Sequence, residues 1–512
     1  MTGEPHDAAR IDLRLVPAAV TAWAVTAAGI LWGAAPSICA ALVAGASTAA
    51  IAWWVRRRDE HPPPVWPGVL AVAVVGVAFA VSVCLRVHDL EQHPVTARQG
   101  GTATVVVTAS ETPRVVAGAR VVFRGTLDAF DGQPSSGRVV VFASVSGYGD
   151  LTAGRPASFR ARVGRPTRPD LSVALLTATG EPRLGDAPRW QRAAASIRAD
   201  YAEAARAVLP ADQAAMLPAL VLGDTSAVDA ATVREFRTAG LTHLTAVSGA
   251  NVTIVCGTVL LIALLVGPRV AAVAAAMALV AFVAVVQPTA SVLRAAIMGG
   301  ITLLAVVSHR RRQAVPALAA TVLVSLIVAP HLAVDIGFVL SVVATAALVV
   351  IAPVWTRRLV DRGWPRPLAA GVAIALAAQV VTAPVVAGVS GAVSLVAVLA
   401  NLAVAPVIPL ITVLGTAAAA MTQLWPAAGR LLIRFTGPEL WWLLHTARWA
   451  AAVPGASVPV PSGPAGAALV AATTVAGVLL WRWRAGRVAV VCTLLCAAAW
   501  AAGRAVGAVG PP

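Results

Sequence analysis

Charged residues are scarce in this sequence: only 12% of its 512 residues are Asp, Glu, Lys or Arg, whereas 58% are hydrophobic. A soluble protein carries roughly 25% charged residues. Apolar runs near the ~20 residues needed to cross a bilayer recur along the whole chain. The composition therefore excludes a soluble globular protein and predicts a polytopic α-helical membrane protein. Because the first apolar run is long and a second follows at once, we expect no cleavable signal peptide.

Lysine is missing altogether, so all 39 basic residues are arginine. Both lysine codons are rich in A, and a GC-rich genome explains this absence without any functional cause. The net charge of +16 is compatible with nucleic-acid binding. However, the cytoplasmic loops of any membrane protein collect arginine. Only arginines outside those loops therefore count in favour of a nucleic-acid partner.

Motifs for metal and nucleotide chemistry are missing too. The eight histidines form neither an H-x-H pair nor an H-E-x-x-H motif, and the chain has no Walker A motif. No nucleophile–base constellation stands out. The five cysteines fall in apolar runs, which predicts buried thiols rather than disulfides. We therefore expect no cofactor, no metal site, no catalytic residue and no enzymatic activity.

The apolar runs and arginine clusters predict the topology. Three spans cover about 15–35, 38–55 and 67–87, and the arginines at 56–58 place the second loop in the cytoplasm. Six further spans are expected near 243–266, 269–286, 289–308, 314–330, 334–354 and 367–389. A broken helix or hairpin (392–419), an interfacial helix (427–452) and two last spans (465–481 and 487–508) follow. The total is about 11–13 transmembrane helices.

The region that follows the third span, residues 88–210, is expected to be extracytoplasmic. It contains five short β-branched runs separated by Gly, Pro and Asp turn signals. This pattern predicts a small β-barrel, and a five-stranded OB-fold is the obvious candidate. A helix over about 189–208 leads back toward the membrane. A short amphipathic surface helix then begins after Asp229 as N-cap and ends at Gly240 in the C′ position.

Polar side chains inside apolar spans are expensive in a bilayer and are therefore functional candidates. Arg294 lies about six residues inside its helix, or ~9 Å deep. A snorkelling arginine at the outer interface is the alternative interpretation. Asp335 begins its helix from the same outer side, either as an N-terminal carboxylate or as a partner of Arg294. Gln379 lies mid-span, and Ser394 and Asn401 share a face of the broken helix, where interhelical hydrogen bonding is the alternative role.

Seven polar residues are expected at a similar depth in the outer half or middle of the membrane: His243, Ser248, Asn251, Arg294, Asp335, Gln379 and Asn401. Their common depth suggests one polar cavity that opens outward. Ser248 and Gly249 lie where the surface helix joins the fourth span, and a broken helix there exposes backbone groups that need water or protein. We therefore predict a hydrated vestibule. A plain N-terminal cap on the fourth span is the alternative.

The stretch from 220 to 255, "LVLGDTSAVDAATVREFRTAGLTHLTAVSGANVTIV", resembles the signature of the ComEC family of competence proteins. Three later stretches, "QPTASVLRAAIMG", "DIGFVLS" and "AAQVVTAPVVAGVSGAVSLVAVLANLAVAPVIPL", resemble later blocks of the same domain in the same order. The resemblance covers about 215–415, and the strand-rich region takes the place of the family's OB domain. Four ordered motifs over 200 residues make this a specific signal.

The resemblance implies an inner-membrane channel, in the cell's cytoplasmic membrane, that imports one DNA strand during natural transformation. The family pattern matches Asp224, Gly240, His243, Ser248, Gly249, Arg294, Asp335, Gln379 and Asn401. One departure is Asn251, which stands where the family usually has a second histidine. Many members also end in a metallo-β-lactamase-like nuclease domain, whose H-x-H-x-D-H motif this sequence lacks. The implied partners are single-stranded DNA, the lipid bilayer, and a separate DNA receptor, nuclease and cytoplasmic motor.

The predicted organisation has six segments: transmembrane helices over 1–88, an extracytoplasmic OB-like β domain over 89–188, connecting and surface helices over 189–242, a competence-type channel domain over 243–425, an interfacial helix and loop over 426–464, and C-terminal transmembrane helices over 465–512.

A basic strand in the β domain is the predicted DNA-binding site. Residues 155–168 contain Phe159 and five arginines without any acidic residue: Arg155, Arg160, Arg162, Arg165 and Arg168. Phosphate contacts and base stacking are what a sequence-tolerant single-strand groove uses. The positive-inside rule does not explain this charge, because the segment is expected outside the cytoplasm. A solvated basic strand is the alternative.

Two other functions stay open. A small-solute or ion permease also has broken helices and midplane polar groups. An inverted repeat would favour it, and the sequence shows none. A non-transporting membrane scaffold of the same family is the third interpretation, because the nuclease motif and one family histidine are missing.

Overall fold

The computed structural model describes residues 12–58, 66–116, 119–149, 151–245, 247–286, 290–307 and 313–480. By its contacts the chain divides into two compact units. The first unit comprises Met1–Ser196 and Val259–Val339, and the second comprises Ile197–Thr258 and Leu340–Pro512. The predicted span over 487–508 lies outside the described residues.

The first unit begins with three apolar helices at the predicted spans: α1 (Val16–Trp32), α2 (Ala34–Arg58) and α3 (Trp66–Glu91). They pack against one another. Gly33 separates α1 from α2 with a φ of 91°, a conformation that favours glycine. Cys39 on α2 is exposed, which corrects the expectation of a buried thiol.

The same unit contains a second group of helices: α9 (Pro268–Val285), α10 (Ala290–Val307), α11 (Ala314–Val328) and the 3-10 helix η3 (Pro330–Val334). Helix α1 packs against α11 and η3. The indole of Trp23 donates a hydrogen bond to the Ala333 carbonyl over 2.8 Å and packs edge-on against Phe338. The N-terminal helices are therefore attached to helices about 300 residues further along the chain.

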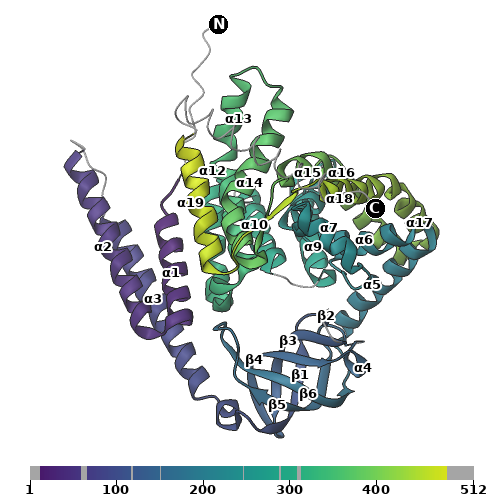
Figure 1. Cartoon of the computed structure of the whole chain (residues 1–512), viewed down its shortest axis with the longest axis horizontal. Helices are drawn as coiled ribbons and strands as arrows, with labels where there is room; N and C mark the ends of the chain where they lie inside the picture. Colours follow the sequence, from purple (N-terminus) through teal and green to yellow (C-terminus); the bar gives the residue numbers. More distant parts are fainter. Residues whose placement is uncertain are drawn as a thin grey trace, which may run out of the picture. The chain divides into compact units, whose positions relative to one another are not determined.

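A closed barrel of five strands forms the β region of this unit (Figure 1). The strands are β1 (Thr102–Ala109), β3 (Arg120–Phe130), β4 (Gln133–Ser144), β5 (Pro156–Gly164) and β6 (Ser172–Leu184), and a short β2 (Arg114–Val116) pairs with β3. The barrel order is β1–β5–β6–β4–β3, and β3 pairs back to β1. All barrel pairings are antiparallel except β4 with β6, which are parallel. Alternate residues point inward, and Val105, Phe123 and Val141 are fully buried.

The second unit is almost entirely helical. Its elements are α5 (Arg189–Val208), α6 (Ala211–Leu222), α7 (Ala230–Thr238), η2 (Thr242–Leu244), α8 (Gly249–Ala263), α12 (Ile336–Val350), α13 (Ala352–Val360), α14 (Arg366–Ser390), β7 (Ala392–Ser394), α15 (Ala397–Val404), α16 (Val407–Leu424), α17 (Pro426–Phe435), α18 (Gly437–Ala452), β8 (Ser457–Pro459) and α19 (Pro464–Leu480). Helices α5, α8 and α12 each continue across the boundary between the units.

Two predicted segments differ from the structure in this unit. The broken helix over 392–419 is confirmed, since α15 and α16 meet at Pro406. However, Ser394 lies in strand β7 and does not share a helix face with Asn401. The single helix predicted over 427–452 is two helices, α17 and α18, which meet at Thr436. A proline occupies the first turn of α18, where its missing N–H removes no helical hydrogen bond.

Five helices of the described residues are long and apolar enough to cross a membrane: Pro67–Arg98, Pro268–Val285, Ile336–Val360, Arg366–Ser390 and Val407–Leu424. Seven further apolar helices have only 10–17 residues. The estimate of about 11–13 spans therefore stays a prediction. Many large apolar side chains on these helices are exposed, as Leu70 and Val77 are on α3. A bilayer is the environment that covers such a surface.

Candidate functional site

The surface helix α7 has the two end caps that its sequence predicts. The Asp229 carboxylate accepts a hydrogen bond from the Thr232 N–H over 2.7 Å, which lowers the pKa of Asp229 below its ordinary value. At the other end, Gly240 has a φ of 73°, and the Leu241 N–H donates to the Phe236 carbonyl over 2.7 Å. This is a Schellman motif. It turns the chain sharply toward the stretch that contains His243 and Ser248.

Gly240 is also the centre of a tight contact with α15, which we call the glycine contact. A Cβ at position 240 would lie 2.4 Å from the Ala397 Cβ and 3.3 Å from the Ser394 Cβ. The Asn401 amide donates to the Ala397 carbonyl over 2.8 Å and approaches the Gly240 carbonyl at 3.4 Å. Gln379 approaches the Ser394 carbonyl at 3.5 Å, which is long for a hydrogen bond. Two predicted site residues, Gln379 and Asn401, thus lie at this contact.

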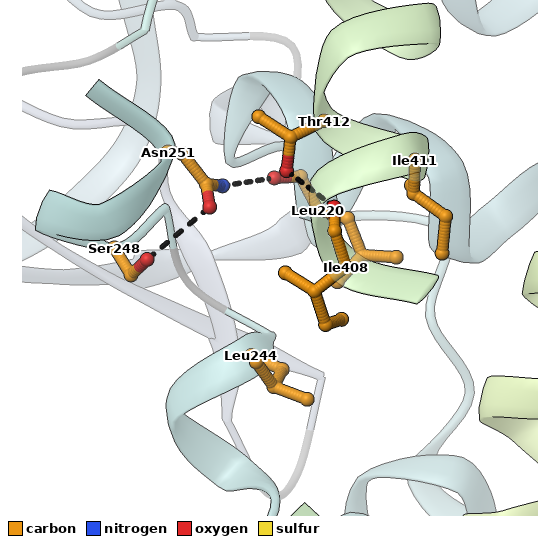
Figure 2. Close-up of a pocket in the computed structure, with 7 residues that line it drawn as sticks. All are labelled: Leu220, Leu244, Ser248, Asn251, Ile408, Ile411 and Thr412. Atoms are coloured by element: carbon orange, nitrogen blue, oxygen red, sulfur yellow. Dashed lines mark hydrogen bonds between the residues drawn. The ribbon is translucent and has the colours of Figure 1, made fainter. Parts of the chain in front are cut away.

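Ser248 and Asn251 form a second polar group at the start of α8 (Figure 2). Asn251 is 6% exposed, and its amide nitrogen donates to the Leu220 carbonyl over 2.8 Å. Its amide oxygen accepts from the Ser248 hydroxyl over 3.2 Å. The last carbonyls of a helix have no partner within that helix. Asn251 therefore satisfies a carbonyl at the end of α6, and α8 begins with a polar cap at the predicted break.

A small pocket lies beside this polar group. Ser248, Asn251 and Leu220 line it together with Leu244 and three residues of α16: Ile408, Ile411 and Thr412 (Figure 2). The Thr412 hydroxyl already donates to the Ile408 carbonyl over 2.8 Å. The pocket has a volume of about 10 Å³, which is room for about one water molecule. It is a small, partly polar pocket between helices and is too narrow for a nucleotide.

Replacing Asn251 tests whether this amide supports the fold. Asn251→Ala is expected to cost about 1–3 kcal/mol, because it leaves the buried Leu220 carbonyl without a donor. Asn251→Asp is expected to cost more, because a carboxylate would face that carbonyl. The midpoint of thermal unfolding of the purified chain measures both. An Asn251→Asp protein as stable as the wild type would contradict the assigned hydrogen bond.

Two other predicted site residues close to the start of α8 have simpler positions. His243 is exposed on η2, and Gly249 is the first residue of α8. The alternative interpretation, a plain N-terminal cap on the fourth span with His243 at the membrane interface, accounts for their positions as well as a vestibule does. Neither residue lines the small pocket.

Arg294 and Asp335 lie in the first unit. Arg294 on α10 is 6% exposed, so protein covers it, whereas a snorkelling side chain would reach the surface. Asp335 accepts a hydrogen bond from the Phe338 N–H over 2.9 Å and caps α12. Among the described residues no ion pair joins Asp335 to Arg294. Of the seven polar residues predicted to share a cavity, five lie in the second unit and two in the first, and the common cavity stays a prediction.

The second unit also contains a charge cluster that the sequence does not predict. Arg448 on α18 contacts Asp212 on α6 at 2.7 Å and Glu235 on α7 at 3.7 Å. All three side chains are about one third exposed. The cluster connects the surface helix α7 to α6 and α18. Because Arg448 is more than 200 positions from both acidic residues along the chain, no local pattern reveals the cluster.

The Arg448 cluster allows a second stability prediction. Arg448→Met is expected to cost about 1–2 kcal/mol, between the values for exposed and buried ion pairs, since it leaves two carboxylates without their cation. The matched control is Arg430→Met on α17, where the arginine is exposed. Thermal unfolding in low and high salt measures the effect. Equal stability of the two variants would contradict a structural role for the cluster.

Residues of the predicted DNA-binding strand point alternately into the barrel and out of it. Arg160, Arg162, Arg165 and Arg168 are exposed, and Arg155 is half-buried with its Nε bound to the Gly185 carbonyl over 2.9 Å. Phe159 is 4% exposed, and its ring packs edge-on against Tyr148 with centroids 5.5 Å apart. The expectation of Phe159 as an exposed stacking platform is therefore wrong. The cause is the strand period of two, which turns Phe159 inward and Arg160 outward.

Arg138 on β4 is a further basic residue of the barrel, and it is not among the predicted DNA-binding residues. Burial lowers the pKa of Arg138, and the Asp170 carboxylate acts in the opposite direction. Its Nη1 atom is buried and has no hydrogen-bond partner within the described part of the chain. Arg138 as a whole is only half-buried, and a guanidinium of this kind is a suitable contact for a phosphate. A single arginine in the stretch "SSGRVV" does not indicate a phosphate contact.

The geometry defines a helical protein with bilayer-length apolar helices, an inserted five-stranded barrel, and a capped surface helix packed on a broken-helix region. The family model described as "Competence protein" matches residues 220–485, which contain the surface helix, the glycine contact and the broken helix. The chain belongs to this competence protein family. No curated protein and no solved structure matches the chain.

Proposed function

We propose that this protein is a multi-pass channel of the cytoplasmic membrane that imports single-stranded DNA during natural transformation. The observation that carries the proposal is the competence protein match over 220–485. The five bilayer-length helices support the membrane location. The proposal concerns passage of the strand and assigns no hydrolysis to these residues.

The barrel supports a role in holding the DNA strand. We propose that it is an OB-fold outside the cytoplasm, because its strand order, with β4 parallel to β6, is that of this fold. OB-folds bind oligonucleotides on their second and third strands and on two adjoining loops. Here those strands are β3 and β4, which contain Arg124 and Arg138, and the loop after β5 contains Arg165 and Arg168. Phosphate contacts by these arginines would retain a strand of any sequence.

A deletion strain tests the proposed function. Labelled single-stranded DNA is expected to reach a nuclease-protected cytoplasmic pool in the complemented strain and not in the deletion strain. If the strand reaches this pool equally without the protein, DNA transport is the wrong function. A small-solute permease or a non-transporting scaffold would then be the better interpretation.

A further inference from the structure

A pocket on the α13–α14 hairpin of the second unit is separate from every residue of the site above. It has a volume of about 410 Å³, within the range of small-molecule sites. One stripe of its lining is formed by Ala352, Thr356 and Val360, which are four residues apart on α13 and therefore share a helix face. Helix α14 supplies the opposite wall with Arg366 and Ile374.

A close helix contact through small residues borders this pocket. Ala347 on α12, Ala352 on α13 and Ala377 on α14 are buried to 2% exposure or less and form one contact between these helices. Such residues let helix backbones approach closely. Ala352 also lines the pocket, so the open volume starts where the alanine contact ends.

The mouth of the pocket is positively charged. Arg357 from α13 and Arg366, the first residue of α14, line it with Asp361 as the one acidic lining residue. Arg357 and Arg366 are exposed and, within the described residues, form no ion pair. The N-terminus of α14 adds a partial positive charge at the same place. The mouth is therefore suited to an anion.

One side of the pocket is apolar, and its side chains are exposed, with Leu348 at 40% and Ile374 at 45% exposure. Leu348 on α12 and Ile374 on α14 line it, and Ile374 lies roughly 12 Å along the helix from Arg366 at 1.5 Å per residue. The Thr356 hydroxyl donates to the Ala352 carbonyl over 2.8 Å, so it presents no free donor to the pocket. A ligand that fits both ends has an anionic head and a hydrocarbon tail.

We propose that this pocket binds an anionic phospholipid, with the phosphate between Arg357 and Arg366 and an acyl chain along Leu348 and Ile374. Basic pockets between helices at a membrane surface bind such headgroups. Trp364 is 41% exposed in the loop between the two arginines, and tryptophan is enriched at that depth of a bilayer. The inference rests on the membrane location proposed above.

Native mass spectrometry of the full chain in detergent, with phosphatidylglycerol or phosphatidylcholine added, tests this site. The double variant Arg357→Gln/Arg366→Gln is expected to bind phosphatidylglycerol roughly 30-fold more weakly, since each arginine near an anionic lipid contributes about fivefold. The matched control is Arg358→Gln/Arg362→Gln, which removes the same charge from the same hairpin but not from the pocket lining. The control is expected to bind like the wild type. Arg357→Lys/Arg366→Lys, which keeps the charge, is expected to retain most of the binding.

Three results would overturn the proposal. Equal losses in both double variants would mean diffuse surface charge rather than a pocket. Equal binding of phosphatidylcholine would exclude recognition of the anion. Displacement of the lipid by a single-stranded oligonucleotide that needs the same two arginines would assign the pocket to DNA. Fractionation of cells tests the membrane location separately, so its failure and the failure of lipid binding are distinguishable.

Discussion

Replacing Phe159 with alanine is expected to unfold the barrel or to destabilise it by about 3–5 kcal/mol, the usual cost of removing a buried aromatic side chain. Phe159 is 4% exposed and packs against Tyr148 in the core. Its strand neighbour Arg160 points outward, so Arg160→Ala is expected to change stability by less than about 0.5 kcal/mol. Thermal unfolding and limited proteolysis of the full chain measure both variants.

Phe159→Leu separates a core role from base stacking. Leucine keeps most of the buried apolar volume, so the barrel is expected to stay folded and its affinity for a single-stranded oligonucleotide is expected to stay within about twofold of the wild type. Loss of a stacking contact would instead remove about 1–3 kcal/mol of binding free energy. An affinity loss of that size in a folded Phe159→Leu protein would restore the stacking role and contradict the structure.

Gly240→Ala is expected to cost about 2–5 kcal/mol and to lower the amount of protein in the membrane. The positive φ of 73° is unfavourable for alanine by about 1–2 kcal/mol. The new Cβ would meet the Ala397 Cβ at 2.4 Å, and overpacking of this kind costs about 1–3 kcal/mol. The unfolding midpoint and the membrane abundance of the full chain measure the effect.

Gly257→Ala is the matched control for this change. Gly257 lies inside α8 of the same unit, its φ is not positive, and a Cβ there would meet nothing within 4 Å. Alanine is also the better helix former by about 1 kcal/mol. If Gly240→Ala is as stable and as abundant as Gly257→Ala, the tight contact between Gly240 and Ala397 is not formed.

The parts that the sequence predicted are those set by local patterns. The β-branched runs between turn residues form the barrel strands, and Asp229 and Gly240 cap their helix because capping depends on a few adjacent positions. The burial of Phe159 also follows from a local pattern. Ala157, Phe159, Ala161 and Val163 alternate with polar residues and are all buried, so the period of two already places Phe159 inside.

The parts that the sequence could not predict are contacts between distant residues. The amide of Asn251 binds a carbonyl 31 positions earlier, and Arg448 binds a carboxylate 236 positions away. Gly240 is in a motif of the resemblance, yet its role against Ala397 depends on how two helices approach each other. Periodicity and propensity carry no information on such pairs, because they arise only when the elements pack.

Import of labelled single-stranded DNA by cells that contain Arg294→Ala is the most direct test of a channel lined by polar residues. Arg294 is covered by protein inside an apolar helix, and the proposed channel would use its charge to offset that of the phosphates. The control is Arg269→Ala, because Arg269 is exposed on α9 of the same unit. At equal membrane abundance, we expect the nuclease-protected pool to fall at least tenfold with Arg294→Ala and to stay at the wild-type level with Arg269→Ala. An unchanged pool with Arg294→Ala would contradict passage of the strand along this residue.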